Sequence, residues 1–220
     1  MEDTEILNLW RAYDKKLEDS LLLNRKNAED ITKMKVQSAL ASMKPLKIFT
    51  LSVGLLWVGF GGMIVINLFV TAFSTVSKFF LFSAAIQLLL TAIAIVIYLY
   101  QFAVIHQVDI NAPILKTQEH LARLKTSTLW VARVLFLQLP LWTTFYLSEN
   151  IFKNGQPVFH IVQGAITLSF TYAAFWLFFN IKYENRDKKW FRLIFDGKEW
   201  NPVMQSMELL NRIDTYKTEQ

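Results

Sequence analysis

The chain of 220 residues contains no cysteine. This absence excludes disulfide bonds, thiolate metal ligands and cysteine nucleophiles. The sequence also lacks a glycine-rich phosphate-binding loop, an HExxH histidine pair and a GxSxG nucleophile elbow. We therefore predict a protein that is not an enzyme and that has no catalytic residue, no cofactor and no metal site.

Charged residues are scarce inside four long apolar stretches. Each stretch meets the requirement of about 20 residues for a helix that crosses about 30 Å of hydrocarbon. The four stretches are residues 48–70, 79–105, 129–151 and 158–181. The sequence therefore predicts an all-α, polytopic membrane protein whose transmembrane region, residues 48–181, contains four helices in two hairpins.

Basic residues are scarce on one side of this arrangement. Of the 23 Lys and Arg residues, 21 fall on the side of the two termini and the central loop 107–127, counting Arg133 just inside the third stretch, and only Lys78 and Lys153 fall on the other side. Because cytoplasmic loops retain Lys and Arg, both termini are predicted to be cytoplasmic, at the inner (plasma) membrane. The net charge of +5 is spread thinly, which favours contact with lipid headgroups and argues against a nucleic-acid partner.

The first 47 residues have the pattern of an amphipathic helix, because apolar residues recur at steps of three and four. The apolar stripe weakens at Asn24 and Asn27, so a strict heptad coiled coil fails there. Two shorter helices and one bent helix both remain compatible with this pattern. Pro45 would kink a helix that continued from residue 30 into the first apolar stretch. We expect Lys44 and Lys47 at the level of the lipid headgroups.

Three segments are expected to form a helical cap on the cytoplasmic side. They are residues 1–47, the loop 107–127, whose helix can run into the third stretch, and residues 182–220. The residues proposed for packing in the cap or for contact with a partner are Trp10, Tyr13, Leu17 and Leu21. Packing within the chain is favoured over an external partner, because an exposed apolar stripe of this size is more readily buried against other helices of the same chain.

The last segment, residues 182–220, is predicted to contain two elements. Basic and aromatic residues interleave over residues 188–195, which is typical of a segment that lies on the bilayer surface. After Asn201 and Pro202, which resemble a helix cap and first position, we predict a final cytoplasmic helix.

Few polar residues occur within the four stretches, and none at mid-depth is acidic. The candidates for polar contacts between helices are Asn67, Gln87, Gln138 and Gln163. Hydrogen bonding between helices is the favoured interpretation, and convergence on a transport path is the alternative. Arg133 is expected to extend to the cytoplasmic headgroups.

Small residues recur on two of the apolar stretches. In the fourth stretch, Ala165, Ser169 and Ala173 follow one another at steps of four, which predicts a face for close helix packing. In the first stretch, Thr50, Gly54 and Gly61 lie on one side and predict a second close approach.

The three histidines are too dispersed for a metal site, because His160 falls on the opposite side from His106 and His120. A membrane enzyme would require a convergent cluster. Its members would be His106, Asp109, Glu119 and His120. We expect these residues to be scattered.

Two motifs resemble a known group of proteins. The run LNLWRAYDKKLEDSLLLN at residues 7–24 and the run NRDKKW at residues 185–190 resemble uncharacterised four-span membrane proteins of Bacteroidota-type bacteria. The likeness covers most of the chain in layout, and its motifs are structural. It implies a bacterial inner membrane and a place beside regulators such as sigma factors, and it carries over no active-site residue.

The leading hypothesis is a non-enzymatic, membrane-anchored interaction or regulatory module that acts through its cytoplasmic helices. The alternative is a small transporter or channel subunit. The expected partners are the lipid bilayer and either a cytoplasmic protein or further copies of the chain.

Overall fold

The computed structural model describes residues 2–107, 114–197, 200–206 and 208–209, and these residues contain helices and turns but no strand. The helices are α1 (Glu2–Thr71), α2 (Lys78–His106), α3 (Ile114–Phe136), α4 (Leu139–Thr144), α5 (Glu149–Asn154), α6 (Pro157–Asn180), the 3-10 helix η1 (Tyr183–Asn185) and α7 (Lys189–Phe195). Residues 201–206 are also helical. Three helices, α1, α2 and α6, are long and apolar enough to cross a membrane.

The first helix is unbroken for 70 residues, a length of about 105 Å at 1.5 Å per residue. It continues through Asn24, Asn27 and Pro45, so of the two alternatives left open by the sequence, a single helix is correct and two shorter helices are wrong. Pro45 removes one backbone hydrogen bond, but residues on both sides of it are held in place by packing. Met43 before it and Leu51 after it are both buried.

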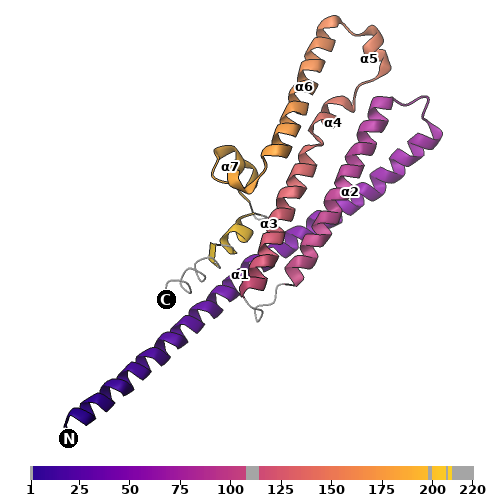
Figure 1. Ribbon diagram of the computed structural model, residues 1–220. Helices are drawn as coiled ribbons and strands as arrows, with labels where there is room; N and C mark the ends of the chain where they lie inside the picture. Colours follow the sequence, from indigo (N-terminus) through magenta and orange to yellow (C-terminus); the bar gives the residue numbers. More distant parts are fainter. Residues whose placement is uncertain (1, 108–113, 198–199, 207, 210–220) are drawn as a thin grey trace.

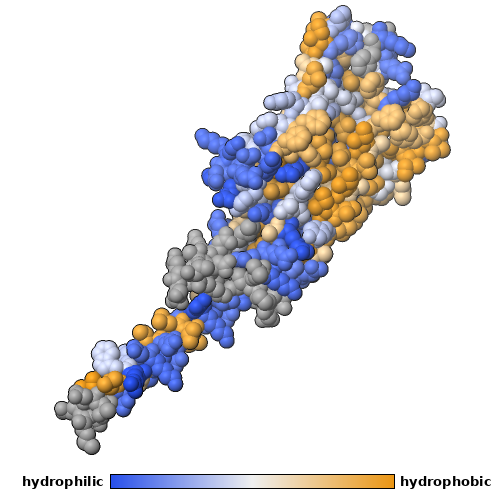
Figure 2. Space-filling model, viewed as in Figure 1, coloured by the Kyte–Doolittle hydropathy of each residue, from blue (hydrophilic) through white to orange (hydrophobic). Residues whose placement is uncertain are grey.

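The helices run beside one another and reverse direction twice at the same end of the molecule (Figure 1). One reversal, at residues 72–77, joins α1 to α2, and the other, around α5, joins α4 to α6. The N-terminal part of α1, the end of α2, the start of α3 and helix α7 lie toward the opposite end. Figure 2 shows an apolar band over the bundle, with polar residues gathered toward the end that carries α7 and along most of the projecting part of α1.

The third apolar stretch, residues 129–151, does not form the single continuous helix that we predicted. It contains the end of α3, the short helix α4 and the start of α5. Pro140 has no amide to donate, so the α3 ladder stops before it and α4 starts with proline in its first turn. Ser148 then begins α5 by accepting a hydrogen bond from the Ile151 amide.

One apolar cluster joins the three segments that were expected to form a cap. Its buried members are Val36, Leu40 and Met43 of α1, Val104 and Ile105 of α2, Leu121 and Leu124 of α3, and Val203 near the C-terminus. A second cluster fixes α7 against the ends of α3 and α6, because Phe191 and Phe195 pack on Leu129 and Ile181. Leu193, on the outer side of α7, is 87% exposed.

Candidate functional site

The most exposed part of the chain is the arm, which we define as residues 2–35 of α1. Every side chain from residue 6 to residue 28 is exposed. The four stripe residues are Trp10 (68% exposed), Tyr13 (73%), Leu17 (55%) and Leu21 (60%). The expectation that they pack in the cap is wrong, because α1 does not bend and its first half projects beyond the other helices (Figure 1).

At the base of the arm lies a buried lysine that the sequence analysis placed at the headgroups. Lys47 is fully buried, and its Nζ donates to Gln101 Oε1 at 2.5 Å. The same Nζ lies 4.3 Å from the centre of the Tyr98 ring. We refer to Lys47, Tyr98 and Gln101 as the Lys47 cluster, which ties α1 to α2 between two apolar clusters.

Helical spacing could have revealed the Lys47 cluster. Lys47 is four residues from Met43 and four from Leu51, both of which face α2, so all three share one side of α1. Tyr98 and Gln101 are three residues apart on α2 and likewise share a side. Gln101 also carries a buried Nε2 with no hydrogen-bond partner among the described residues. A buried amide group without a hydrogen-bond partner lowers the stability of the fold by about 1–3 kcal/mol. Sequence alone does not reveal this cost.

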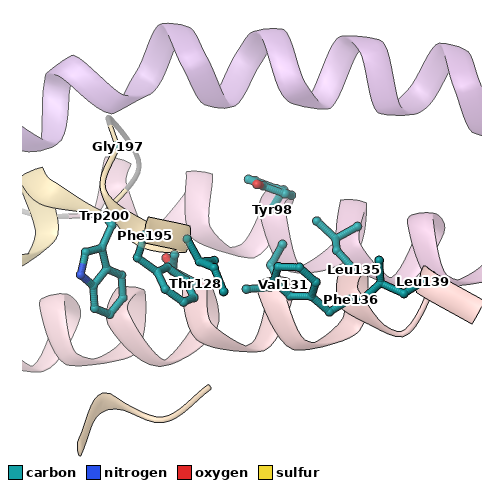
Figure 3. Close-up of a pocket in the computed structure, with 11 residues that line it drawn as sticks. Tyr98, Thr128, Val131, Leu135, Phe136, Leu139, Phe195, Gly197 and Trp200 are labelled. Atoms are coloured by element: carbon teal, nitrogen blue, oxygen red, sulfur yellow. The ribbon is translucent and has the colours of Figure 1, made fainter. Parts of the chain in front are cut away.

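An apolar pocket of about 430 Å³ lies beside Tyr98 (Figure 3). It is bounded by α2, by α3 and the start of α4, and by the end of α7 with Gly197 and Trp200. Its walls include Tyr98, Thr128, Val131, Phe136, Phe195 and Trp200. The Thr128 hydroxyl donates to the Leu124 carbonyl, so it is already engaged. The described lining offers mostly apolar surface, which suits an apolar group.

Two of the four polar candidates make hydrogen bonds between elements. Gln163, which is buried on α6, accepts from the Tyr146 hydroxyl at 2.6 Å and donates to the Thr143 carbonyl at 2.6 Å. Gln138 donates to Thr91 Oγ1 of α2 at 3.1 Å. These bonds connect the α4 region to α6 on one side and to α2 on the other.

The other two polar candidates lie elsewhere. Asn67 is exposed, and its Oδ1 accepts only a long bond of 3.3 Å from Thr71 on the same helix. Gln87 lines an apolar groove between α1, α2 and α4. The four side chains therefore occupy separate places and do not converge on one lumen.

The predicted packing face of α6 is wrong. Ala165 and Ser169 are exposed and Ala173 is only half-buried, whereas Gln163 and Ala174 are buried. The Gln163 amide donates to the Thr143 carbonyl, so Gln163 lies on the side of α6 that faces α4. Residue 165 lies two positions further on, about 200° around the helix, and so faces outward.

The small residues of α1 do mark a close approach between helices. A Cβ atom added at Gly54 would lie 3.1 Å from Ile95 Cγ1, and one added at Gly61 would lie 2.9 Å from Leu88 Cδ2. Both neighbours belong to α2. The α1–α2 pair, which supports the arm, is therefore packed at the distance that glycine allows.

The possible enzyme cluster is not assembled by the described residues. His106 Nδ1 lies 3.0 Å from the Phe102 carbonyl, and Glu119 pairs with Arg123. His120 is half-buried, and Asp109 lies outside the described residues. Among the residues that the structure describes, no group of three or more His, Cys, Asp or Glu side chains could hold a metal ion.

Comparison with protein-family models, with curated proteins and with solved structures finds no match. The geometry of the arm and its base therefore carries the functional argument.

Basic residues also gather where α3 meets the end of α6. Arg133 Nε donates to the Ile181 carbonyl at 2.8 Å, so it binds the last turn of α6 instead of only extending to headgroups. Further along, Lys125 Nζ lies 3.8 Å and the Arg186 guanidinium 4.5 Å from the centre of the Tyr183 ring. Burial lowers the pKa of Lys125, and the nearby Arg186 charge lowers it further.

Replacing Arg186 by Gln is expected to raise the pKa of Lys125 toward the usual lysine value, because one repelling charge is removed. A lysine whose pKa is lower in the folded state binds fewer protons there, so its contribution to stability increases as the pH rises through that pKa. A ¹³C-lysine NMR titration of the full chain measures the pKa directly. The matched control is Arg123→Gln, since Arg123 is paired with Glu119. An equal shift in both variants would contradict this assignment.

Proposed function

We propose that the chain is a non-enzymatic, four-span protein of the inner (plasma) membrane that acts as an anchored interaction or regulatory module. The single observation that carries the proposal is the continuity of α1, which joins an exposed apolar stripe to an apolar helix without a break. A soluble linker would leave such a stripe free to fold back. An unbroken helix keeps the stripe exposed and accessible to a partner.

The proposed topology has both termini in the cytoplasm. It is supported by the 21 basic residues on the side of the arm and by the presence of only Lys78 and Lys153 at the two reversals. The fourth crossing in this proposal is residues 129–151, in which α3 continues through α4 toward α5. At its interruption, the half-buried Gln138 donates from its side chain to Thr91 Oγ1 of α2, so the irregular turn is packed against protein, as a bilayer requires.

A transporter or channel is less well supported. A transport path requires polar groups that line a common route, but Gln138 and Gln163 are engaged at different helix contacts. Asn67 is exposed on the outside of α1.

The proposed function is tested by photo-crosslinking in intact membranes. A photoreactive phenylalanine analogue replaces Trp10 or Tyr13 in the full chain, and the matched control places it at Lys15. Lys15 lies five residues from Trp10, about 140° around the helix, so it faces away from the stripe. We expect protein adducts from the stripe positions and at least about tenfold less from Lys15, in line with the loss of a buried contact.

A substitution distinguishes specific contact through the stripe from non-specific crosslinking. Leu17→Asp should abolish the adducts, whereas Leu22→Asp should retain them, because Leu17 and Leu22 are equally exposed (55% and 59%) but lie on different sides of the arm. Adducts that consist only of lipid, or equal yields on both sides, would overturn the proposal.

A further inference from the structure

We propose that the partner of the arm is a second copy of this chain, aligned parallel and in register, so that two arms form a coiled coil above the membrane. This inference rests on the proposed function, because it names the partner of the same stripe. It is argued from the direction of the arm, the residues along its seam and the charges that flank the seam.

The direction of the arm restricts what can cover it. Because α1 is one helix, the arm continues along the axis of its apolar half. It leads away from the bilayer, so a lipid surface does not cover the stripe. Two copies in one membrane have their arms pointing the same way, and a two-fold axis along the membrane normal brings identical faces together. A parallel pairing is therefore the arrangement that anchoring favours.

The seam of the arm follows a heptad spacing once α1 is known to be continuous. Positions a of the repeat are Trp10, Leu17, Asn24 and Ile31, and positions d are Ile6, Tyr13, Ser20, Asn27 and Met34. All nine side chains are exposed. The centre of the seam is thus too polar for a strictly apolar heptad repeat. Every side chain of the seam is nevertheless exposed and can contact a second helix.

The polar centre of the seam favours self-pairing in one register. An Asn at an a position favours the register in which it meets the same Asn of a parallel second helix. Other registers are disfavoured, because they bury the Asn amide without a hydrogen-bond partner. Asn24 occupies such a position. In an in-register dimer Asn24 meets Asn24 of the second copy, whereas an unrelated apolar partner leaves its amide unsatisfied.

The charges beside the seam are compatible with the same pairing. In a parallel dimer, a g residue faces the e residue five positions later in the other chain. Asp30 then faces Lys35 of the second copy, which is an attractive pair. The other pairs are Leu9 with Asp14, Lys16 with Leu21, and Leu23 with Ala28. None of these combines like charges, so no repulsion opposes the in-register arrangement.

The absence of cysteine makes a direct test possible in the full-length chain. Single cysteines are introduced as Tyr13→Cys, Leu17→Cys or Asn24→Cys on the seam and as Lys15→Cys or Leu22→Cys on the outside. The protein is reconstituted in lipid nanodiscs, oxidised with copper phenanthroline and run on a non-reducing gel. A disulfide requires Cα atoms about 4.4–6.8 Å apart, so only residues that face themselves in the second copy crosslink efficiently.

We expect a disulfide-linked dimer from the three seam variants and about tenfold less from the two outside variants. Native mass spectrometry of the unmodified chain should give a dimer that Leu17→Asp dissociates and Leu22→Asp does not. Equal crosslinking at all five positions, or a monomer in native mass spectrometry, would overturn the dimer. If the stripe still yields photo-adducts with another protein in that case, the proposed function stands and only the identity of the partner is wrong.

Discussion

Replacing Gln101 by Leu is expected to lower the free energy of unfolding by about 2–4 kcal/mol, because it removes the Gln101 oxygen that accepts a hydrogen bond from the buried ammonium of Lys47. The Tyr98 ring remains on one side of Lys47, but a ring face replaces only part of a hydrogen bond to a charged group. The loss is measured from reversible unfolding in mixed micelles as the fraction of SDS increases. The matched control is Gln87→Leu, the same change at a half-buried position of the same helix.

A double substitution separates the charge from the packing. Lys47→Met combined with Gln101→Leu should recover most of the lost stability, because replacing both members of a buried polar pair by apolar residues is close to neutral. The coupling energy between the two positions is then positive and comparable to the single loss. If Gln101→Leu costs no more than Gln87→Leu, Lys47 does not depend on Gln101 and the description of the cluster is wrong.

Replacing Gly54 by Leu is expected to cost about 1–3 kcal/mol, because its Cβ alone would lie 3.1 Å from Ile95 and the rest of the side chain has no room between α1 and α2. Unfolding in mixed micelles gives the magnitude, and a spin-label distance between α1 and α2 reports their separation. We expect the two helices to move apart as stability falls.

The chain supplies a control on the same helix. Gly59 has no atom within 4 Å of an added Cβ, so Gly59→Leu should be nearly neutral. Shortening the neighbour in Gly54→Leu/Ile95→Ala should restore part of the lost stability by making space. A similar loss at Gly54 and Gly59 would mean that close packing against Ile95 does not set the effect, because the higher helix propensity of Leu would by itself stabilise both positions.

Sequence predicts best where one physical force acts along a whole segment. The stretches 79–105 and 158–181 correspond to α2 (Lys78–His106) and α6 (Pro157–Asn180), with each end within one residue. Uniform apolar composition sets these lengths, whatever the helices pack against. The glycines of α1 also predicted its packing correctly, because a position without a side chain permits close approach of a neighbouring helix, whichever helix that is.

Prediction was poorer where the outcome depends on a partner far away in sequence. A lysine beside an apolar stretch is expected at the lipid headgroups. The burial of Lys47 depends instead on Gln101 and Tyr98, which are more than 50 positions later in the sequence. Likewise, Ala165 and Ser169 make a regular stripe, but the hydrogen bonds of Gln163 determine which side of α6 is buried. Pro45 suggested a break by local rules, and packing on both sides of it preserves the helix.

The unbroken course of α1 has a mechanical consequence. The arm of 34 residues is about 50 Å long, and it has no joint where it leaves the bundle. A change of about 10° in the tilt of the apolar half, of the kind that bilayer thickness imposes, therefore displaces the tip near Ile6 by roughly 9 Å. In the topology proposed above, a small tilt of the apolar part of α1 is therefore converted into a large displacement of the arm.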